Sequence, residues 1–273
     1  MPELPEVETV RRGVHEVAVG RQIGAVRVTG ARTVRRSSAQ LVSLGSSGKT
    51  IIDTGRHGKW FWLTLHDDAR VLIHLRMSGQ LLWSPDSSVP SPKHTHVAFP
   101  LGDSGELRFV DPRTFGEVLV VPPDQDVMTV IHQGPDALDI SAAALAGVLR
   151  GRQRALKAIL LDQKALAGIG NIYADEICHS ARIRPLKVAA SLSRPAVGRL
   201  HDAIQTVLSA AVDARGSSLA DAQYVDLFGV TGSYQHNHRV HARQHQPCTT
   251  CGTPITRVPW SGRSTYFCAS CQR

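Results

Sequence analysis

Residues 248–271 read CTTCGTPITRVPWSGRSTYFCASC and hold four of the five cysteines of the chain. The two Cys-x-x-Cys pairs are separated by a stretch as long as a β-hairpin. Each pair offers two thiolates to one tetrahedral ion, and four sulfur ligands without an open position suit structural zinc. The alternative, a redox dithiol, needs only one such pair. The spacing therefore predicts one structural Zn²⁺ bound by Cys248, Cys251, Cys268 and Cys271, which fixes a hairpin that carries Arg263.

Upstream of this hairpin the composition changes at Gly134-Pro135-Asp136. After that point the apolar periodicity predicts helices at about 141–150, 155–164, 171–181 and 194–213. Before it, a helix opens at Pro5, and β-forming segments punctuated by Gly, Pro, Ser and Asp run from about Ile23 to Val121. We expect an α+β multidomain protein. Its parts are a helix plus β-sandwich (1–133), a helical domain (134–232) and a zinc hairpin (233–273).

The net charge of +8 is concentrated in the second half of the chain. Up to Gln133 there are 15 Lys and Arg against 14 Asp and Glu, and from Gly134 onward 16 against 9. Such a basic half attracts polyanions, of which nucleic acid is the commonest inside cells, although a solvated surface is the plain alternative. No segment resembles a membrane span or a signal peptide, so we expect a cytoplasmic protein without membrane contacts.

The first residues, Met1-Pro2-Glu3, suggest covalent chemistry. Removal of the initiator methionine would leave Pro2 with a free secondary amine. An α-amino group titrates near pH ~7.7–8, against ~10.4 for lysine, so much of it is nucleophilic at neutral pH. Attack on a sugar C1′ forms a cationic iminium that favours β-elimination, with Glu3 placed to move protons. Taken alone, these residues also fit an ordinary terminus.

Five blocks along the chain together resemble the formamidopyrimidine-DNA glycosylases of the Fpg/Nei family. The blocks are MPELPEVET (1–9), HLRMSG (74–79), DPRTFG (111–116), LKAILLDQ (156–163) continued by GIGNIYADE (168–176), and GRST (262–265) within the zinc hairpin. The resemblance implies a helix–two-turn–helix fold around 156–176. It also implies a bifunctional glycosylase and lyase that excises oxidised purines such as 8-oxoguanine and formamidopyrimidines, followed by β,δ-elimination. The implied partner is double-stranded DNA with an oxidised base or abasic site, bound by a monomer in the bacterial nucleoid.

The same resemblance assigns roles to individual residues. Pro2 is the nucleophile, and Glu3 and Lys59 assist proton transfer. Arg263 is the fourth catalytic residue, which grips phosphates beside the lesion and assists the second elimination. Met77, Arg113 and Phe115 fill the gap that an extruded nucleotide leaves in the duplex. The residues expected to contact the DNA backbone are His94, Arg152, Arg154, Lys157 and Asn171. The DNA is expected to lie in a cleft between the two halves.

Three stretches depart from the family pattern or vary within it. Residues 240–243 read VHAR where relatives usually have Tyr and Gly, and Ile177-Cys178-His179 stands where a bulky Leu-Phe pair is usual. We expect Cys178 to be a buried packing cysteine. The loop 216–232 corresponds to one that closes over the flipped base and varies among relatives, which leaves the lesion preference open.

Three other functions remain as alternatives. An endonuclease VIII-like enzyme would act on oxidised pyrimidines, but such relatives usually carry glycine where Leu4 stands. A lesion-binding protein without catalysis would not need Pro2, Glu3 and Lys59 intact. A zinc-ribbon regulator leaves the N-terminal motif unexplained.

Overall fold

In the computed structural model, residues 2–219 and 224–273 are described, and the chain divides into two compact units. Unit 1 comprises Met1–His132 and Arg215–Ser233, and unit 2 comprises Gln133–Ala214 and Tyr234–Arg273. We expected 215–232 to belong to the helical domain. It belongs instead to unit 1, because Tyr224 and Leu227 are buried in the core of that unit. The zinc hairpin, expected as a separate domain, clusters with the helices of unit 2.

Two antiparallel four-stranded sheets form a β-sandwich in the described part of unit 1, as the sequence predicted. One sheet has the order β1-β6-β7-β5 and the other β2-β3-β4-β8. The strands are β1 (Arg27–Val28), β2 (Ile51–His57), β3 (Trp60–Leu65), β4 (Arg70–His74), β5 (Gln80–Ser84), β6 (Thr95–Leu101), β7 (Gly105–Val110) and β8 (Glu117–Val121). Phe61, Phe99 and Phe109 are fully buried in the core of the unit. Since burial of a large aromatic side chain contributes several kcal/mol, these rings, one from β3 and two from the other sheet, help to hold the two sheets together.

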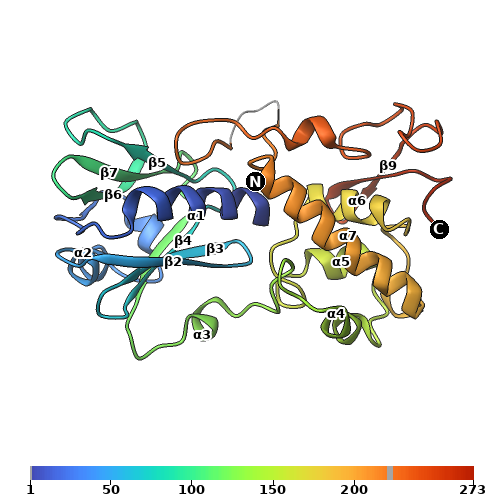
Figure 1. Ribbon diagram of the computed structural model, residues 1–273, viewed down its shortest axis with the longest axis horizontal. Helices are drawn as coiled ribbons and strands as arrows, with labels where there is room; N and C mark the ends of the chain where they lie inside the picture. The colour runs from blue at the N-terminus through green and yellow to red at the C-terminus, as the bar shows by residue number, and fades with distance from the viewer. Residues whose placement is uncertain (1, 220–223) are drawn as a thin grey trace. The chain divides into compact units, whose positions relative to one another are not determined.

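Helix α1 (Leu4–Ala18) packs against β2 and β3 (Figure 1). Val7, Val10 and Val14 recur on one helical face and are buried in the core. The shorter elements of this unit are η1 (Ala31–Val34), α2 (Ala39–Ser46) and α3 (Val127–Ile131). The start of α1 is thereby fixed to the sandwich.

Unit 2 is built on α4 (Ala142–Leu149), α5 (Leu156–Leu161), α6 (Asn171–Ser180) and α7 (Arg194–Asp213). These bounds agree with the predicted helices to within three residues. The long helix α7 buries one apolar face and packs against α4 and α6 (Figure 1). The remaining elements are η2 (Ala189–Ser191), η3 (Tyr234–Asn237), β9 (Thr256–Trp260) and β10 (Arg263–Phe267). Among the described residues, no helix has both the length and the apolar character to cross a bilayer.

Candidate nucleic-acid interface and zinc centre

Pro2 and Glu3 lie buried at the N-terminal end of α1, where Glu3 is the N-cap residue. Glu6 Oε2 accepts the backbone N–H of Glu3 at 2.8 Å, and its Oε1 accepts the N–H of Ser217 at 2.7 Å. A Cβ at Gly216, whose φ is +80°, would lie 2.6 Å from Glu6 Oε1, so only glycine fits there. One buried carboxylate therefore fixes both the backbone next to Pro2 and the start of the 215–233 segment.

Lys59 lies in the two-residue turn of the β2–β3 hairpin, and only 6% of it is exposed. The guanidinium of Arg56 donates to Gly58 O and to Glu8 Oε2, both at 3.1 Å. Burial opposes ionisation of Glu8, but hydrogen bonds and charge from Arg11 and other arginines keep its pKa below the ordinary value. The Glu8–Arg56 pair thus ties the turn that carries Lys59 to helix α1.

The side chains of Met77 and Phe115 are 41% and 40% exposed, although both are large and apolar. The guanidinium of Arg113 lies over the Phe115 ring, 4.8 Å from its centroid. Arg76 and Thr114, next to these side chains, both have φ of +55°. Exposed apolar side chains on a strained backbone are typical of binding loops rather than of a core.

Asp111 is fully buried and joins these two loops. Its Oδ1 accepts the Ser78 hydroxyl at 2.5 Å and the Arg113 N–H at 3.1 Å, and its Oδ2 accepts the Gly116 N–H at 2.7 Å. Its own N–H donates to the carbonyl of His94, an exposed residue with φ of +68°. The structure therefore brings Met77, Arg113, Phe115 and His94 into neighbouring loops.

Glu117 links the same two loops from a second position. Its Oε1 accepts hydrogen bonds from Arg35 at 2.5 Å and Arg76 at 2.7 Å. Arg35 also donates to the carbonyls of Phe115 at 3.0 Å and Gly116 at 3.1 Å. Sequence reasoning missed Arg35 and Glu117, because they are 82 positions apart and belong together only after the strands have paired.

His74 is a further residue that the sequence did not single out. Its ring packs edge-on against Trp60 with centroids 4.7 Å apart, and its Nδ1 accepts the N–H of Arg76 at 2.9 Å. Burial, with the charges of Arg76 and Lys59, holds the pKa of His74 well below its ordinary value. His74 is therefore a neutral imidazole at physiological pH, close enough to Lys59 to sense its charge.

In unit 2, Lys157 is completely buried. Its ammonium donates to Asp175 Oδ1 at 2.7 Å, to Thr265 Oγ1 at 3.0 Å and to Ser264 O at 3.1 Å. An ammonium has three N–H donors, and these acceptors use all three. We expected Lys157 to contact a phosphate itself. Its three hydrogen bonds instead hold β10 against α5 and α6.

Asn171 begins α6 and also contacts the hairpin, since its Nδ2 donates to Ser264 O at 3.2 Å. Its buried Oδ1 has no hydrogen-bond partner within residues 2–219 and 224–273. Lys157 and Asn171 therefore converge on one carbonyl of β10, directly after Arg263.

Arg263 is exposed and follows the Ser261-Gly262 turn, where both residues have positive φ, as a type I′ hairpin requires. Together with Arg154 and Trp260 it lines a small pocket of about 170 Å³. Arg154 is 57% exposed and pairs with Asp162 at 3.1 Å, and Arg152 is exposed nearby in sequence. Two guanidinium groups at one pocket can bind phosphate oxygens by paired hydrogen bonds.

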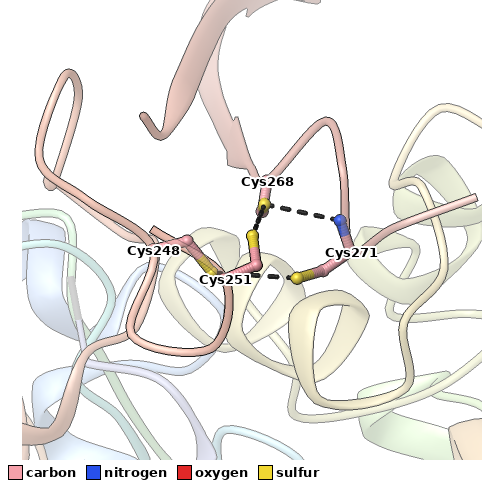
Figure 2. A group of neighbouring side chains, drawn as sticks. All are labelled: Cys248, Cys251, Cys268 and Cys271. Carbon is pink, nitrogen blue, oxygen red and sulfur yellow. Dashed lines mark hydrogen bonds between the residues drawn. The ribbon is translucent and has the colours of Figure 1, made fainter. Parts of the chain in front are cut away.

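The four predicted zinc ligands converge, with their sulfur atoms within 4.8 Å of one another (Figure 2). Cys248 Sγ lies 3.9 Å from Cys271 Sγ, and Cys251 Sγ lies 3.5 Å from Cys268 Sγ. Zn–S bonds of about 2.3 Å in a tetrahedron place the sulfurs about 3.8 Å apart, so the set fits one zinc ion. The contacts among the sulfurs, led by that with Cys251, raise the pKa of Cys271 to about 12, whereas hydrogen bonds from Thr253 lower the pKa of Cys251 to about 6.

The unusual stretch 240–243 is anchored by Glu176, whose carboxylate accepts the N–H groups of Arg239, Val240 and His241 at 2.8, 3.0 and 2.8 Å. His241 Nδ1 also lies 3.2 Å from Asp175 Oδ2. Burial raises the pKa of Glu176 against the effect of these bonds. The stretch is thus held on α6 mainly through its backbone, with one side-chain contact added by His241.

The loop 216–232 is closed at its base. The Ser218 hydroxyl donates to Tyr224 O at 2.8 Å and accepts the N–H of Gly232 at 3.0 Å. Residues 220–223, the middle of the expected base-capping loop, lie outside the described residues, as does Met1. Cys178 is completely buried, as expected, and burial raises the pKa of its thiol.

Three families match successive parts of the chain. They are the formamidopyrimidine-DNA glycosylase N-terminal domain over residues 1–118, its H2TH domain over 132–223, and the zinc finger found in FPG and IleRS over 246–273. Together they span nearly the whole length of the protein.

Individual relatives agree with these matches. A protein of Nocardia farcinica named formamidopyrimidine-DNA glycosylase is 41% identical, with 100% of this chain and 98% of that protein covered. Lactococcus lactis Fpg in complex with DNA containing an abasic site is similar in structure, with a TM-score of 0.90, 32% identity and 99% of each chain covered. The same enzyme with Fapy-dG DNA gives a TM-score of 0.89 at 32% identity, covering 99% of this chain and all of the other. With these matches and the zinc-ligand geometry, the chain belongs to the formamidopyrimidine-DNA glycosylase family.

Proposed function

We propose that this protein is a bifunctional DNA glycosylase and AP lyase of base excision repair that removes oxidised purines, 8-oxoguanine and formamidopyrimidines. The observation that carries the proposal is Pro2-Glu3 at the start of α1, held by Glu6 and tied through Glu8 and Arg56 to the Lys59 turn. The names of the relatives and the DNA in the Lactococcus lactis structures support it.

In this mechanism the amine of Pro2, freed by loss of Met1, attacks C1′ of the lesion nucleotide. The new C–N bond forms as the glycosidic bond breaks, and the base leaves with the electron pair and takes up a proton. Glu3 and Lys59 move protons during base loss and ring opening. The C1′–O4′ bond then opens, which leaves an iminium between Pro2 and C1′. Glu3 or Lys59 takes the C2′ proton, the electrons of the C2′–H bond move toward the iminium, and the 3′ phosphate leaves. A second elimination expels the 5′ phosphate, and water hydrolyses the iminium, which frees Pro2 and leaves a one-nucleotide gap.

Both units contribute DNA contacts. From unit 1, Met77, Arg113 and Phe115 take the place of the extruded nucleotide, and His94 contacts the backbone. From unit 2, the phosphate contacts are Arg152, Arg154, Asn171 and Arg263. Lys157 acts through the position of the hairpin, which zinc stabilises without taking part in the reaction. We propose a monomer that works in the bacterial cytoplasm on the nucleoid.

The test is borohydride trapping on duplex DNA with an abasic site, followed by peptide mass spectrometry. We expect intact protein that begins at Pro2 and an adduct on that residue. Glu3→Gln should bind lesion duplex as the wild type does but release no base. An adduct on another residue, or full activity with Met1 retained, contradicts the mechanism.

The closest alternative within this chemistry, excision of oxidised pyrimidines, is tested with the same preparation. Rates on 8-oxoguanine opposite cytosine should exceed those on thymine glycol. The reverse order would assign the protein an endonuclease VIII-like specificity.

A further inference from the structure

Three polar residues of α6 lie on one face of the helix and point at the zinc module. Asn171, Asp175 and His179 follow each other at intervals of four residues, which places their side chains in one row. Asn171 donates to Ser264 O at 3.2 Å, Asp175 accepts from buried Lys157 at 2.7 Å, and His179 Nε2 lies 3.5 Å from Cys248 Sγ. The first contact holds the hairpin strand directly, the second holds it through Lys157, and the third reaches a zinc ligand.

The ring of His179 is 4% exposed, so its hydrogen bonds are made inside the protein. In the part of the chain that the structure describes, its buried Nδ1 has no hydrogen-bond partner. If Nε2 carried no hydrogen, its lone pair would face the lone pairs of a thiolate, and an N–H at Nδ1 would be buried without an acceptor. Both are unfavourable, so the hydrogen belongs on Nε2, where it points at Cys248.

In the zinc-loaded protein this contact would help to disperse the negative charge of the metal site. Four thiolates around Zn²⁺ leave a net charge of −2 in a partly buried site, and N–H donors to sulfur disperse that charge. Cys248 is itself 3% exposed and receives one backbone donor, the N–H of Thr250 at 3.4 Å. His179 supplies a side-chain donor to the same sulfur.

We propose that His179 is an outer hydrogen-bond donor to the zinc centre, which fixes the Cys248 thiolate and slows loss of the metal. It is a positioning residue rather than a ligand, because the four cysteines already complete a tetrahedron. Through the row on α6 it also joins the metal site to the helix that begins with Asn171.

The test compares zinc release from purified full-length, zinc-loaded variants into excess 4-(2-pyridylazo)resorcinol. His179→Phe should release zinc roughly tenfold faster than the wild type, the effect of losing one hydrogen bond to a charged group. His179→Gln, which keeps an N–H donor, should stay within about threefold of the wild type. His201→Phe, a histidine of α7 whose Nε2 lies 3.1 Å from Ile140 O, is the matched control and should not change the rate.

Three results would overturn the proposal. The first is equal release from His179→Phe and the wild type, and the second is release from His179→Gln as fast as from His179→Phe. The third comes from the visible spectrum of Co²⁺-substituted protein. We expect the bands of a four-sulfur site in both the wild type and His179→Phe, whereas three-sulfur, one-nitrogen bands in the wild type alone would make His179 a ligand.

Discussion

Replacement of Lys157 by methionine separates a positioning role from a phosphate contact. The substitution keeps the length of the side chain but removes the ammonium, so Asp175, which is fully buried, loses its ion-pair partner. Breaking a buried pair in this way costs about 3–5 kcal/mol, because an uncompensated charge stays in the interior. The bonds to Ser264 O and Thr265 Oγ1 are lost as well. We therefore expect a large fall in the stability of unit 2.

Two measurements check this expectation. Urea unfolding followed by circular dichroism at 222 nm should show a lower midpoint for Lys157→Met, and Lys157→Met/Asp175→Asn should recover part of the loss because no charge remains buried. Fluorescence anisotropy with a tetrahydrofuran-containing duplex gives the salt dependence of binding. Each phosphate contact contributes a slope of about −0.9, so the slope should be unchanged in Lys157→Met and reduced by about 0.9 in Arg154→Ala.

The opposite pattern would refute the reasoning. If Lys157→Met unfolded at the wild-type urea concentration while its salt slope fell by about one, the ammonium would be a direct phosphate ligand. Its three bonds within the protein would then not describe the DNA-bound state.

Three further predictions follow from the same geometry. Glu117→Gln should slow single-turnover excision of 8-oxoguanine roughly tenfold, because both exposed loops lose a shared anchor, but it should have little effect on borohydride trapping at an abasic site. The control is Glu106→Gln, which changes a buried carboxylate paired with Arg27 and Arg108. It should not slow excision while leaving trapping unchanged. The folded-state pKa of Glu8 lies below the ordinary 4.5, so the ionised carboxylate stabilises the fold above pH 4.5, and this contribution is lost as the pH falls through the lowered pKa. Between pH 6 and 3 the melting temperature should therefore decline less steeply for Glu8→Gln than for the wild type. Cys268→Ser, or zinc removal by a chelator, should weaken duplex binding in anisotropy measurements, and normal cutting by that variant would contradict the role of zinc.

The sequence predicted much of the fold because the signals involved are local. Helix periodicity, turn residues and the cysteine spacing each act within about twenty residues, and α7 and the zinc ligands follow the expected pattern closely. The contact of 215–233 with the sandwich unit was not predicted, for the opposite reason. That segment is fixed by burial of Tyr224 and Leu227 against strands far away in the sequence.

For single residues of the candidate site, too, the sequence does not predict contacts between distant positions. Residue types and motifs indicated Pro2, Lys59 and Arg263, but they do not show which charged groups neutralise each other. Lys157 reads as a surface cation in the sequence, and its burial depends on Asp175 and on the hairpin 107 and 108 positions away. Contacts over such separations come from tertiary packing, which no local pattern encodes.

The interleaving of the two units has a consequence for synthesis on the ribosome. The chain passes from one unit to the other after residues 132, 214 and 233, so neither unit is a continuous segment. Unit 1 cannot complete its core until Tyr224 and Leu227 have emerged, by which time helices α4 to α7 have already been translated. An N-terminal domain usually folds before the next domain is made, but here unit 1 cannot fold completely before unit 2 has been largely translated. A truncated 1–132 fragment would expose the apolar surface that Tyr224 and Leu227 cover.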